Sequence, residues 1–320
     1  MPIVSVDPAH PSAFRAAIAA AAKEIATGRL VAFPTETVYG LGADATNGEA
    51  LARIFEAKGR PRINPLIVHV ESAKAARRLV QFNPLALRLA EAFWPGGLTL
   101  VLPKSAKCPV HDLASAGLPT LAVRVPAHPV AQALILSAGV PIAAPSANAS
   151  GEPSPTRAAH VAESLGGALT ILDAGPCNAG LESTVIGFDG RQAVLLRPGA
   201  TPREEIEAIT GPLAVPSDDG GRPASPGRML RHYAPAARLR LNADAPREGE
   251  LFIAFGPTGI DDALQLSEAR STREAAANLF ALLREADKRG AEAVAVAPIP
   301  STGLGEAIND RLERAAAAQS

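Results

Sequence analysis

The chain has 320 residues, of which 47% are hydrophobic and 20% are charged, and its formal net charge at pH 7 is −1. This balance is typical of a globular protein with one large or two ordinary domains, and it argues against disorder. Residues 1–211 hold 18 Lys and Arg against 17 Asp and Glu, and residues 212–320 hold 13 against 15. Neither half is a polycation, so nothing in the composition suggests bulk attraction to nucleic acid or to an anionic membrane.

Cysteine usage and hydropathy narrow the class of protein further. The two cysteines, Cys108 and Cys177, cannot cross-link a chain of this length and lack metal-ligand spacing. Residues 1–10 do not resemble a signal peptide, and no apolar run reaches about 18 residues. We therefore expect a cytoplasmic protein with no membrane segment.

From residue 13 to about 200, helical and strand patterns alternate. Helical periodicity covers residues 14–25, 50–57, 85–93 and 130–138. Short apolar runs occupy residues 30–33, 66–70, 98–102, 121–125, 142–144, 169–172, 185–188 and 194–196. Eight short strands with interspersed helices predict an α/β or α+β domain built on a twisted mixed sheet, over residues 1–210.

Residues 211–236 change in character, because Gly, Pro, Ser and Asp dominate and the periodicity ends. We predict an interdomain linker here, and a connection of this length is usually functional or mobile. Apolar runs at 239–241, 251–255 and 293–297 alternate with helical patterns at 272–289 and 305–318. Residues 237–320 therefore form a second, small α/β domain in this prediction.

The common nucleotide and hydrolase signatures are absent from the sequence. It contains no GxxxxGK[ST], no GxGxxG after a strand, no HExxH, no paired CxxC and no GxSxG. Any nucleotide site must therefore be built from other residues.

Residues 33–42, FPTETVYGLG, gather hydrogen-bonding side chains directly after a predicted strand. Thr35 is among them, and Gly40 and Gly42 permit close approach of a ligand to the backbone. A strand-to-helix turn with its own caps would explain the same composition.

Three cations, Lys58, Arg60 and Arg62, follow with no acid between them. Pro61 and Pro65 exclude a regular helix over this stretch. In an extended segment the three side chains would form a comb on one face, and a triphosphate laid across it would relieve their repulsion. A solvated basic loop is the alternative.

Further polar side chains follow other predicted strands. Ser146, Asn148 and Ser154 lie in a small-residue loop that can present hydroxyl and N–H groups to phosphates, although a plain turn fits equally well. Arg124 lies on the strand face opposite Leu121, Val123 and Val125, where it needs a buried carboxylate or an anionic ligand.

Six segments, in the order FPTETVYGLG, AKGRPRINPLIVHV, LAVRVP, APSANASG, STVI and LLRPG, resemble the YrdC-like domain of the threonylcarbamoyl-AMP synthases. The stretch SPGRMLRHYAP resembles the connection to the small C-terminal domain of the longer family members. The resemblance covers nearly the whole chain. It implies a twisted mixed sheet with helices and a basic concave cleft, followed by a small Rossmann-like domain.

The resemblance also implies a nucleotidyltransferase reaction in which L-threonine, bicarbonate and ATP give L-threonylcarbamoyl-AMP and pyrophosphate, with Mg²⁺ accompanying ATP. The product would pass to a downstream machinery that modifies adenosine 37 of tRNA, and we expect no stable direct binding of tRNA. An RNA-binding module built on the same domain is the alternative. A hydrogenase-maturation carbamoyltransferase fits poorly, because the chain has no room for its extra domains.

The resemblance assigns two groups of site residues by position. For ATP they are Lys58, Arg60, Arg62, Thr120, Ser146, Asn148, Ser154, Arg197 and Tyr233, the last closing the site from the linker. For threonine they are Thr35, His69, Arg124, Ala144 and Ser183.

Within the threonine group, Arg124 would face the amino-acid carboxylate and Ala144 would contribute only its backbone. A lone histidine such as His69, at the end of an apolar run, is more often a satisfied core residue. Because the nucleophile comes from the substrates, we expect no catalytic side chain and no resident metal site.

Overall fold

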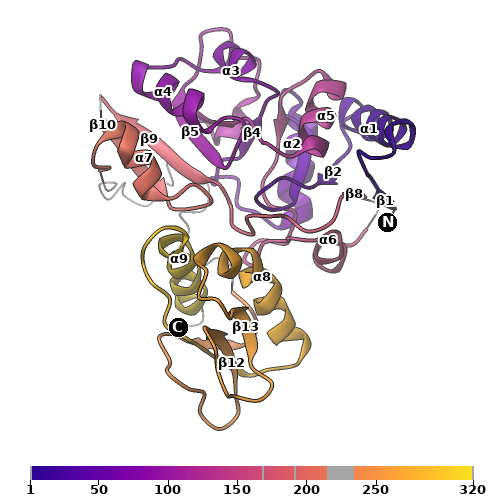
Figure 1. Cartoon of the computed structure of the whole chain (residues 1–320). Coiled ribbons are helices and arrows are strands. Elements are labelled where there is room, and N and C mark those ends of the chain that lie inside the picture. The colour runs from indigo at the N-terminus through magenta and orange to yellow at the C-terminus, as the bar shows by residue number, and fades with distance from the viewer. Residues whose placement is uncertain (1, 168, 191, 215–233, 319–320) are drawn as a thin grey trace.

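The computed structural model describes residues 2–167, 169–190, 192–214 and 234–318, and these residues form two sheets (Figure 1). The larger sheet has ten strands in the order β1-β8-β2-β3-β7-β4-β6-β5-β9-β10, and the smaller has four in the order β11-β14-β12-β13. The boundaries predicted at 210 and 236 stay a prediction, and most of the predicted linker lies outside the described residues.

The ten-stranded sheet mixes parallel and antiparallel pairs, as predicted. Its strands are β1 (Ile3–Ser5), β2 (Val31–Phe33), β3 (Gly40–Asp44), β4 (Ile67–His69), β5 (Leu98–Pro103), β6 (Thr120–Arg124), β7 (Ile142–Ala143), β8 (Thr170–Asp173), β9 (Thr184–Asp189) and β10 (Gln192–Arg197). β4 runs parallel to β6 and β5 parallel to β9, whereas β5–β6 and β9–β10 are antiparallel. All eight strands predicted from apolar runs are confirmed, while β1 and β3 were not predicted.

Helices cover this sheet, and the four predicted ones are confirmed. The helices are α1 (Pro11–Ala26), α2 (Gly48–Lys58), α3 (Ala73–Leu79), α4 (Pro84–Phe93), α5 (Pro129–Ala138), α6 (Ala158–Leu165) and α7 (Arg203–Thr210), with a 3₁₀ turn at Asp112–Ser115. The four that were predicted are α1, α2, α4 and α5. Local chemistry sets where they begin. The Asn47 side chain accepts hydrogen bonds from the amides of Glu49 and Ala50 at the start of α2, and a proline opens α4 and α5.

The strand-to-helix turn considered for residues 33–42 is wrong, because β2 and β3 form an antiparallel pair instead. Gly42 allows this pairing: a Cβ there would lie 2.6 Å from Cε1 of Phe33. The missing side chain of Gly42 makes room for the Phe33 ring, and Gly42 does not line the cavity described below. Residues 34–39 thus become a connection between two strands, at the edge of the site described below.

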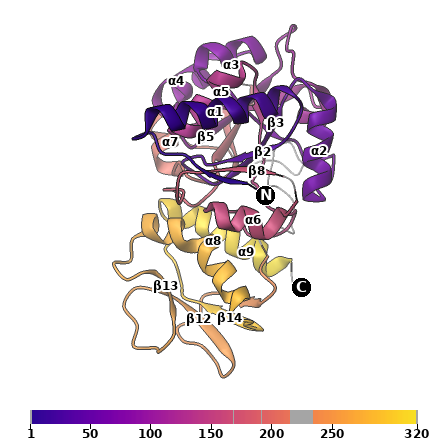
Figure 2. The same cartoon turned by 90° about the vertical axis from the view of Figure 1, so that its right-hand side faces the viewer.

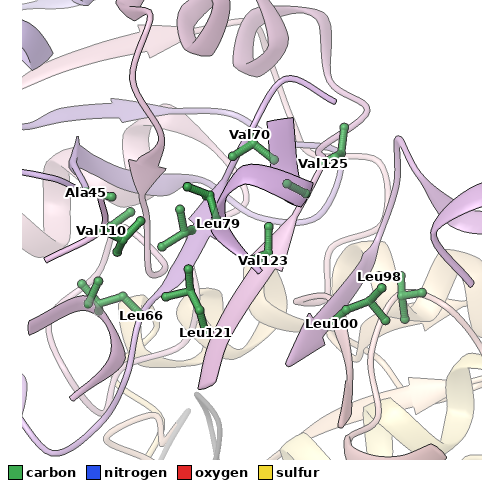
Figure 3. Packing of buried hydrophobic residues seen from close by; sticks show 14 of the residues in the cluster. Ala45, Leu66, Val70, Leu79, Leu98, Leu100, Val110, Leu121, Val123 and Val125 are labelled. Carbon is green, nitrogen blue, oxygen red and sulfur yellow. The ribbon is translucent and has the colours of Figure 1, made fainter. Parts of the chain in front are cut away.

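Side chains on β5 and β6 alternate between the two faces of the sheet. Leu98, Leu100, Leu121 and Val123 point into the main core (Figure 3). Ala122 belongs to a separate small cluster, with Ile67, Val101 and Val185. The predicted division of faces on residues 121–125 is confirmed, and it leaves Arg124 on the side of the small cluster.

The smaller sheet is entirely parallel. Its elements are β11 (Arg238–Arg240), β12 (Glu250–Phe255), β13 (Leu264–Ser267), α8 (Thr272–Lys288), β14 (Ala293–Val296) and α9 (Leu304–Ala317). A Rossmann-like fold is thereby confirmed, with β13 as a strand that was not predicted. Helices α8 and α9 lie between this sheet and the larger body (Figures 1 and 2). Their buried side chains share one cluster with Val38 and Leu181 of that body.

Candidate functional site

A cavity opens on the face of the large sheet opposite the main core. It is lined by Thr35, Thr37, Val38, Gly40, Arg60, Pro65, Leu66, Ile67, His69, Arg124, Ala144, Pro145, Ser146, Glu182, Ser183 and Arg197. Eight residues of the predicted site are among them: Thr35, Arg60, His69, Arg124, Ala144, Ser146, Ser183 and Arg197. The sheet order brings these distant segments to one place.

The other predicted residues do not line the cavity. Lys58, Asn148 and Ser154 lie behind its wall, and Arg62 is exposed to solvent. Thr120 begins β6 while Arg124 ends it, so about 13 Å of strand separate the two. Tyr233 lies outside the described residues.

His69 and Arg124 are direct neighbours, because the parallel register of β4 and β6 pairs them. The His69 side chain is buried against Phe33, and its Nδ1 atom has no hydrogen-bond partner among the described residues. Burial, together with the positive charge of Arg124, lowers the pKa of His69 to about 3. The imidazole is therefore neutral at pH 7, and its Nδ1 atom can donate to or accept from a ligand, according to the tautomer.

Arg124 has a carboxylate partner within the protein. Its Nη2 donates to Oε1 of Glu36 at 2.6 Å, its Nη1 to Oγ1 of Thr37 at 2.9 Å, and its Nε to the Gly96 carbonyl at 3.0 Å. Burial raises the pKa of Glu36, but the charge and hydrogen bond of Arg124 outweigh it and leave that pKa lowered.

The sequence left open whether Arg124 meets a buried carboxylate or a ligand, and the structure supplies the carboxylate of Glu36. Three of the five N–H donors of this guanidinium already donate to protein acceptors in that arrangement. The assignment of Arg124 to the threonine carboxylate stays a prediction, in which the ligand would share the guanidinium with Glu36.

The predicted comb of Lys58, Arg60 and Arg62 is wrong. Lys58 is the last residue of α2, which Gly59 ends in the left-handed conformation at φ 59°. Pro61 and Pro65 exclude a helix only beyond this point, so they leave α2 free to continue up to Lys58. Arg60 turns back to the carbonyls of Asn64 and Pro65, at 3.3 and 2.9 Å. Of the three cations, only Arg62 is exposed.

Lys58 instead supports the small-residue loop. Its Nζ donates to the carbonyl of Ser146 at 2.6 Å and to that of Asn148. Burial, together with the charge of Arg60, lowers the pKa of Lys58 well below its usual value. The side-chain amide of Asn148 holds the same loop by donating to the carbonyls of Ala149 and Glu152, both at 2.9 Å. The predicted ATP contacts of Lys58 and Asn148 stay predictions.

The wall opposite His69 is formed by Glu182, Ser183 and Arg197. Arg197 Nη2 donates to the Ser183 carbonyl at 2.7 Å, and the Ser183 hydroxyl lies 2.7 Å from Oγ1 of Thr99. Parallel pairing of β5 with β9 and the β9–β10 hairpin bring these residues together.

Sequence reasoning missed Glu182, a buried carboxylate in the cavity wall. It accepts hydrogen bonds from the Ser154 hydroxyl and from Nε of Arg311, the latter at 2.9 Å. Burial would raise the pKa of Glu182, but Arg311 and Arg197 outweigh it and lower that pKa to about 2. The only local signal was its place before Ser183 and Thr184, because Arg311 lies 129 residues away along the chain.

The cavity favours an anionic ligand. Three guanidinium groups, those of Arg60, Arg124 and Arg197, line it together with one carboxylate, that of Glu182. Guanidinium groups bind carboxylate and phosphate through paired hydrogen bonds. Among the described residues, no group of three or more His, Cys, Asp and Glu side chains could hold a metal ion. Within the same residues, no helix is long and apolar enough to span a bilayer.

Two family models match adjoining parts of the chain. Residues 23–199 match the Sua5/YciO/YrdC model, described as "Telomere recombination", and residues 201–317 match the model described as "Threonylcarbamoyl-AMP synthase, C-terminal domain".

Individual relatives agree with both models. A threonylcarbamoyl-AMP synthase of Bacillus subtilis is 42% identical over 93% of this chain and 92% of its own length. The synthase of Pyrococcus abyssi is 44% identical, over 92% of each chain. The crystal structure of P. abyssi Sua5 complexed with L-threonine superimposes with a TM-score of 0.90 at 41% identity, covering 100% of this chain and 98% of that one.

Proposed function

The chain belongs to the threonylcarbamoyl-AMP synthase family, and on that premise we propose that it makes L-threonylcarbamoyl-AMP and pyrophosphate from L-threonine, bicarbonate and ATP. The observation that carries the proposal is the cavity itself. A neutral histidine with an unpartnered nitrogen, three guanidinium groups and several hydroxyls meet there, on a fold shared with a threonine-bound relative.

The reaction needs no nucleophile from the protein. The threonine nitrogen adds to the carbon of bicarbonate, and loss of water leaves a carbamate. A carbamate oxygen then attacks the α-phosphorus of ATP, the bond from that phosphorus to the β-bridging oxygen breaks, and pyrophosphate leaves. The protein must align these groups and neutralise their charge, which is what Arg, Ser and Thr side chains can supply.

The two walls of the cavity divide this work in our proposal. His69, Arg124 and Thr35 lie together near the β2–β3 connection and would hold the amino acid. Ser183 would meet it from the opposite wall, where Arg197 supplies positive charge for the phosphates, and Arg60, bonded to the carbonyls before β4, would add to that charge.

We propose that Mg²⁺ arrives as the ATP complex. Mg²⁺ dehydrates reluctantly and is commonly held by substrate phosphates with few protein ligands. Dependence of pyrophosphate release on added Mg²⁺, and its loss in excess chelator, would test this. The product would then pass to the machinery that threonylcarbamoylates tRNA.

The test of the function is pyrophosphate release from ATP with threonine or bicarbonate omitted in turn. We expect release only when both are present. Release that needs neither would indicate a nucleotide hydrolase and contradict the proposal. No release, combined with RNA binding that weakens steeply with salt, would favour the RNA-binding module instead.

A further inference from the structure

The C-terminal domain reaches the wall of the cavity through one buried side chain. Arg311 on α9 has an exposed fraction of 0%. Its Nε donates to Oε2 of Glu182 at 2.9 Å, and its Nη2 donates to the carbonyl of Pro198, also at 2.9 Å. Asp310 accepts a third hydrogen bond, from Nη1 at 2.5 Å. A buried guanidinium is stable only when its donors are engaged in this way.

The chain around Glu182 is held by the same domain at consecutive positions. Gly180 touches the backbone of α8 so closely that a Cβ there would lie 2.3 Å from the carbonyl oxygen of Ala276. Leu181 is fully buried in the core that α8 and α9 share with the small sheet. The next two residues, Glu182 and Ser183, line the cavity. The C-terminal domain therefore fixes this wall from behind.

The charges around Glu182 show what Arg311 contributes beyond packing. One carboxylate lies within the influence of two cations, Arg311 behind the wall and Arg197 in its lining. Without Arg311, Arg197 would become the main counter-charge of Glu182. The guanidinium of Arg197 would then be drawn toward Glu182 and would stabilise a bound anion less well.

We propose that Arg311 is a positioning residue of the synthase site: it holds Glu182, and through it Ser154, and so leaves the charge of Arg197 directed at the phosphates of ATP. This inference rests on the proposed function, since it assigns Arg197 to the nucleotide. Arg311 itself lines no part of the cavity and is not expected to touch substrate.

The experiment compares Arg311→Gln with Glu306→Gln in the full chain. Glu306 is the matched control, because it also joins α9 to the larger body, through an ion pair with Arg203 of 2.5 Å, but lies outside the cavity lining. We expect Arg311→Gln to raise KM for ATP by at least about tenfold and to change KM for threonine less, since small displacements in a site cost between about tenfold and about 100-fold. Glu306→Gln should leave both within about twofold.

Two further variants separate charge from folding. Arg311→Lys keeps the charge but cannot keep both bonds to Glu182 and Pro198, so it should fall between wild type and Arg311→Gln. The double variant Arg311→Gln/Glu182→Gln removes the uncompensated carboxylate, and we expect it to recover part of the ATP affinity lost in Arg311→Gln. Loss of packing alone would give no such recovery.

The outcomes distinguish this inference from the proposed function. Wild-type protein that releases no pyrophosphate refutes the function, and the same variants are then compared by calorimetric ATP binding. Arg311→Gln that matches Glu306→Gln in either assay overturns the positioning role alone. Equal increases in both KM values, without recovery in the double variant, overturn it as well.

Discussion

The two walls of the cavity are supported in different ways. On the first wall, formed by β4 and β6, the ion pair between Arg124 and Glu36 lies entirely within the larger body. On the second wall, the ion pair of Glu182 is completed by Arg311 from the C-terminal domain. On the first wall, Nδ1 of His69 has no hydrogen-bond partner among the described residues and is available to a ligand. On the second wall, both carboxylate oxygens of Glu182 already accept hydrogen bonds from the protein. In the proposed function, the amino-acid side of the site would thus be self-contained, and the nucleotide side would depend on both domains.

The largest expected effect comes from Lys58, which supports the second wall by holding the loop that leads to Ser154. We expect Lys58→Ala to lower turnover by at least about 100-fold, a cost of roughly 3 kcal/mol, because the loop that carries Ser146 loses its anchor. It should also lower the free energy of unfolding by at least about 2 kcal/mol, because two carbonyls of that loop lose their donor. Steady-state kinetics and urea unfolding measure the two losses, with Lys74→Ala on the exposed side of α3 as control. Unchanged stability would contradict the buried anchoring of Lys58.

Arg62 sharpens the comparison because it is exposed and belongs to neither wall. We expect Arg62→Ala to lower turnover by at least about 100-fold, if its charge meets the phosphates of ATP as predicted. Its unfolding free energy should stay within about 0.5 kcal/mol of wild type, as for most exposed substitutions. A turnover near that of wild type would remove Arg62 from the site.

As the pH falls, the contribution of His69 on the first wall to the free energy of unfolding should be lost before that of Glu182 on the second wall. The pKa of His69 is lowered to about 3 from 6.5, so the unfolded chain takes up a proton first and stability falls as the pH drops below 6.5. The pKa of Glu182 is lowered to about 2 from 4.5, so its contribution is lost only below pH 4.5.

Urea unfolding at pH 7.5 and pH 5 tests this order. Between these values the wild type should lose about 2 kcal/mol more stability than His69→Asn, from the protonation of one histidine in the unfolded chain. The difference between wild type and His69→Asn at pH 7.5 is the control, because it measures the packing lost at this position without protonation. Equal losses in wild type and His69→Asn would show that His69 does not titrate in this way.

The smallest expected effect concerns the internal partner of Arg124. Glu36→Gln keeps the shape of the side chain but removes its charge, so Arg124 is held less firmly. We expect KM for threonine to rise about tenfold while KM for ATP stays within about threefold, consistent with one weakened charge-assisted hydrogen bond. If both KM values rise together, the two walls are not independent.

Strands and their faces could be predicted because an apolar run or an alternation of period two is local information. Strand β3 was not predicted because Gly40 and Gly42 interrupt its apolar pattern, although these glycines permit its pairing with β2. The predicted comb of Lys58, Arg60 and Arg62 was wrong because α2 continues to Lys58 and ends at Gly59, which is in the left-handed conformation. The prolines that suggested an extended segment lie beyond that end.

Partners far apart in the chain could not be predicted from local patterns. The sequence indicated that Arg124 needs an anion, but Glu36 lies 88 residues away and reaches it only through the sheet order. Arg311 carried no signal at all, since an arginine on an amphipathic helix is usually exposed. The site residues that were found came from the resemblance to a family, and their roles await the variants above.

Gly180 has a consequence for how this protein could vary. With φ at 69° and helix α8 in contact, it leaves no space for a side chain, so a substitution there would force this segment and α8 apart. A replacement domain of similar fold would therefore have to reproduce both the close approach of α8 to Gly180 and the hydrogen bond from Arg311 on α9 to Glu182. The C-terminal domain is thus fitted closely to the larger body at this glycine, and exchanging it alone would disturb the cavity wall that begins two residues later, at Glu182.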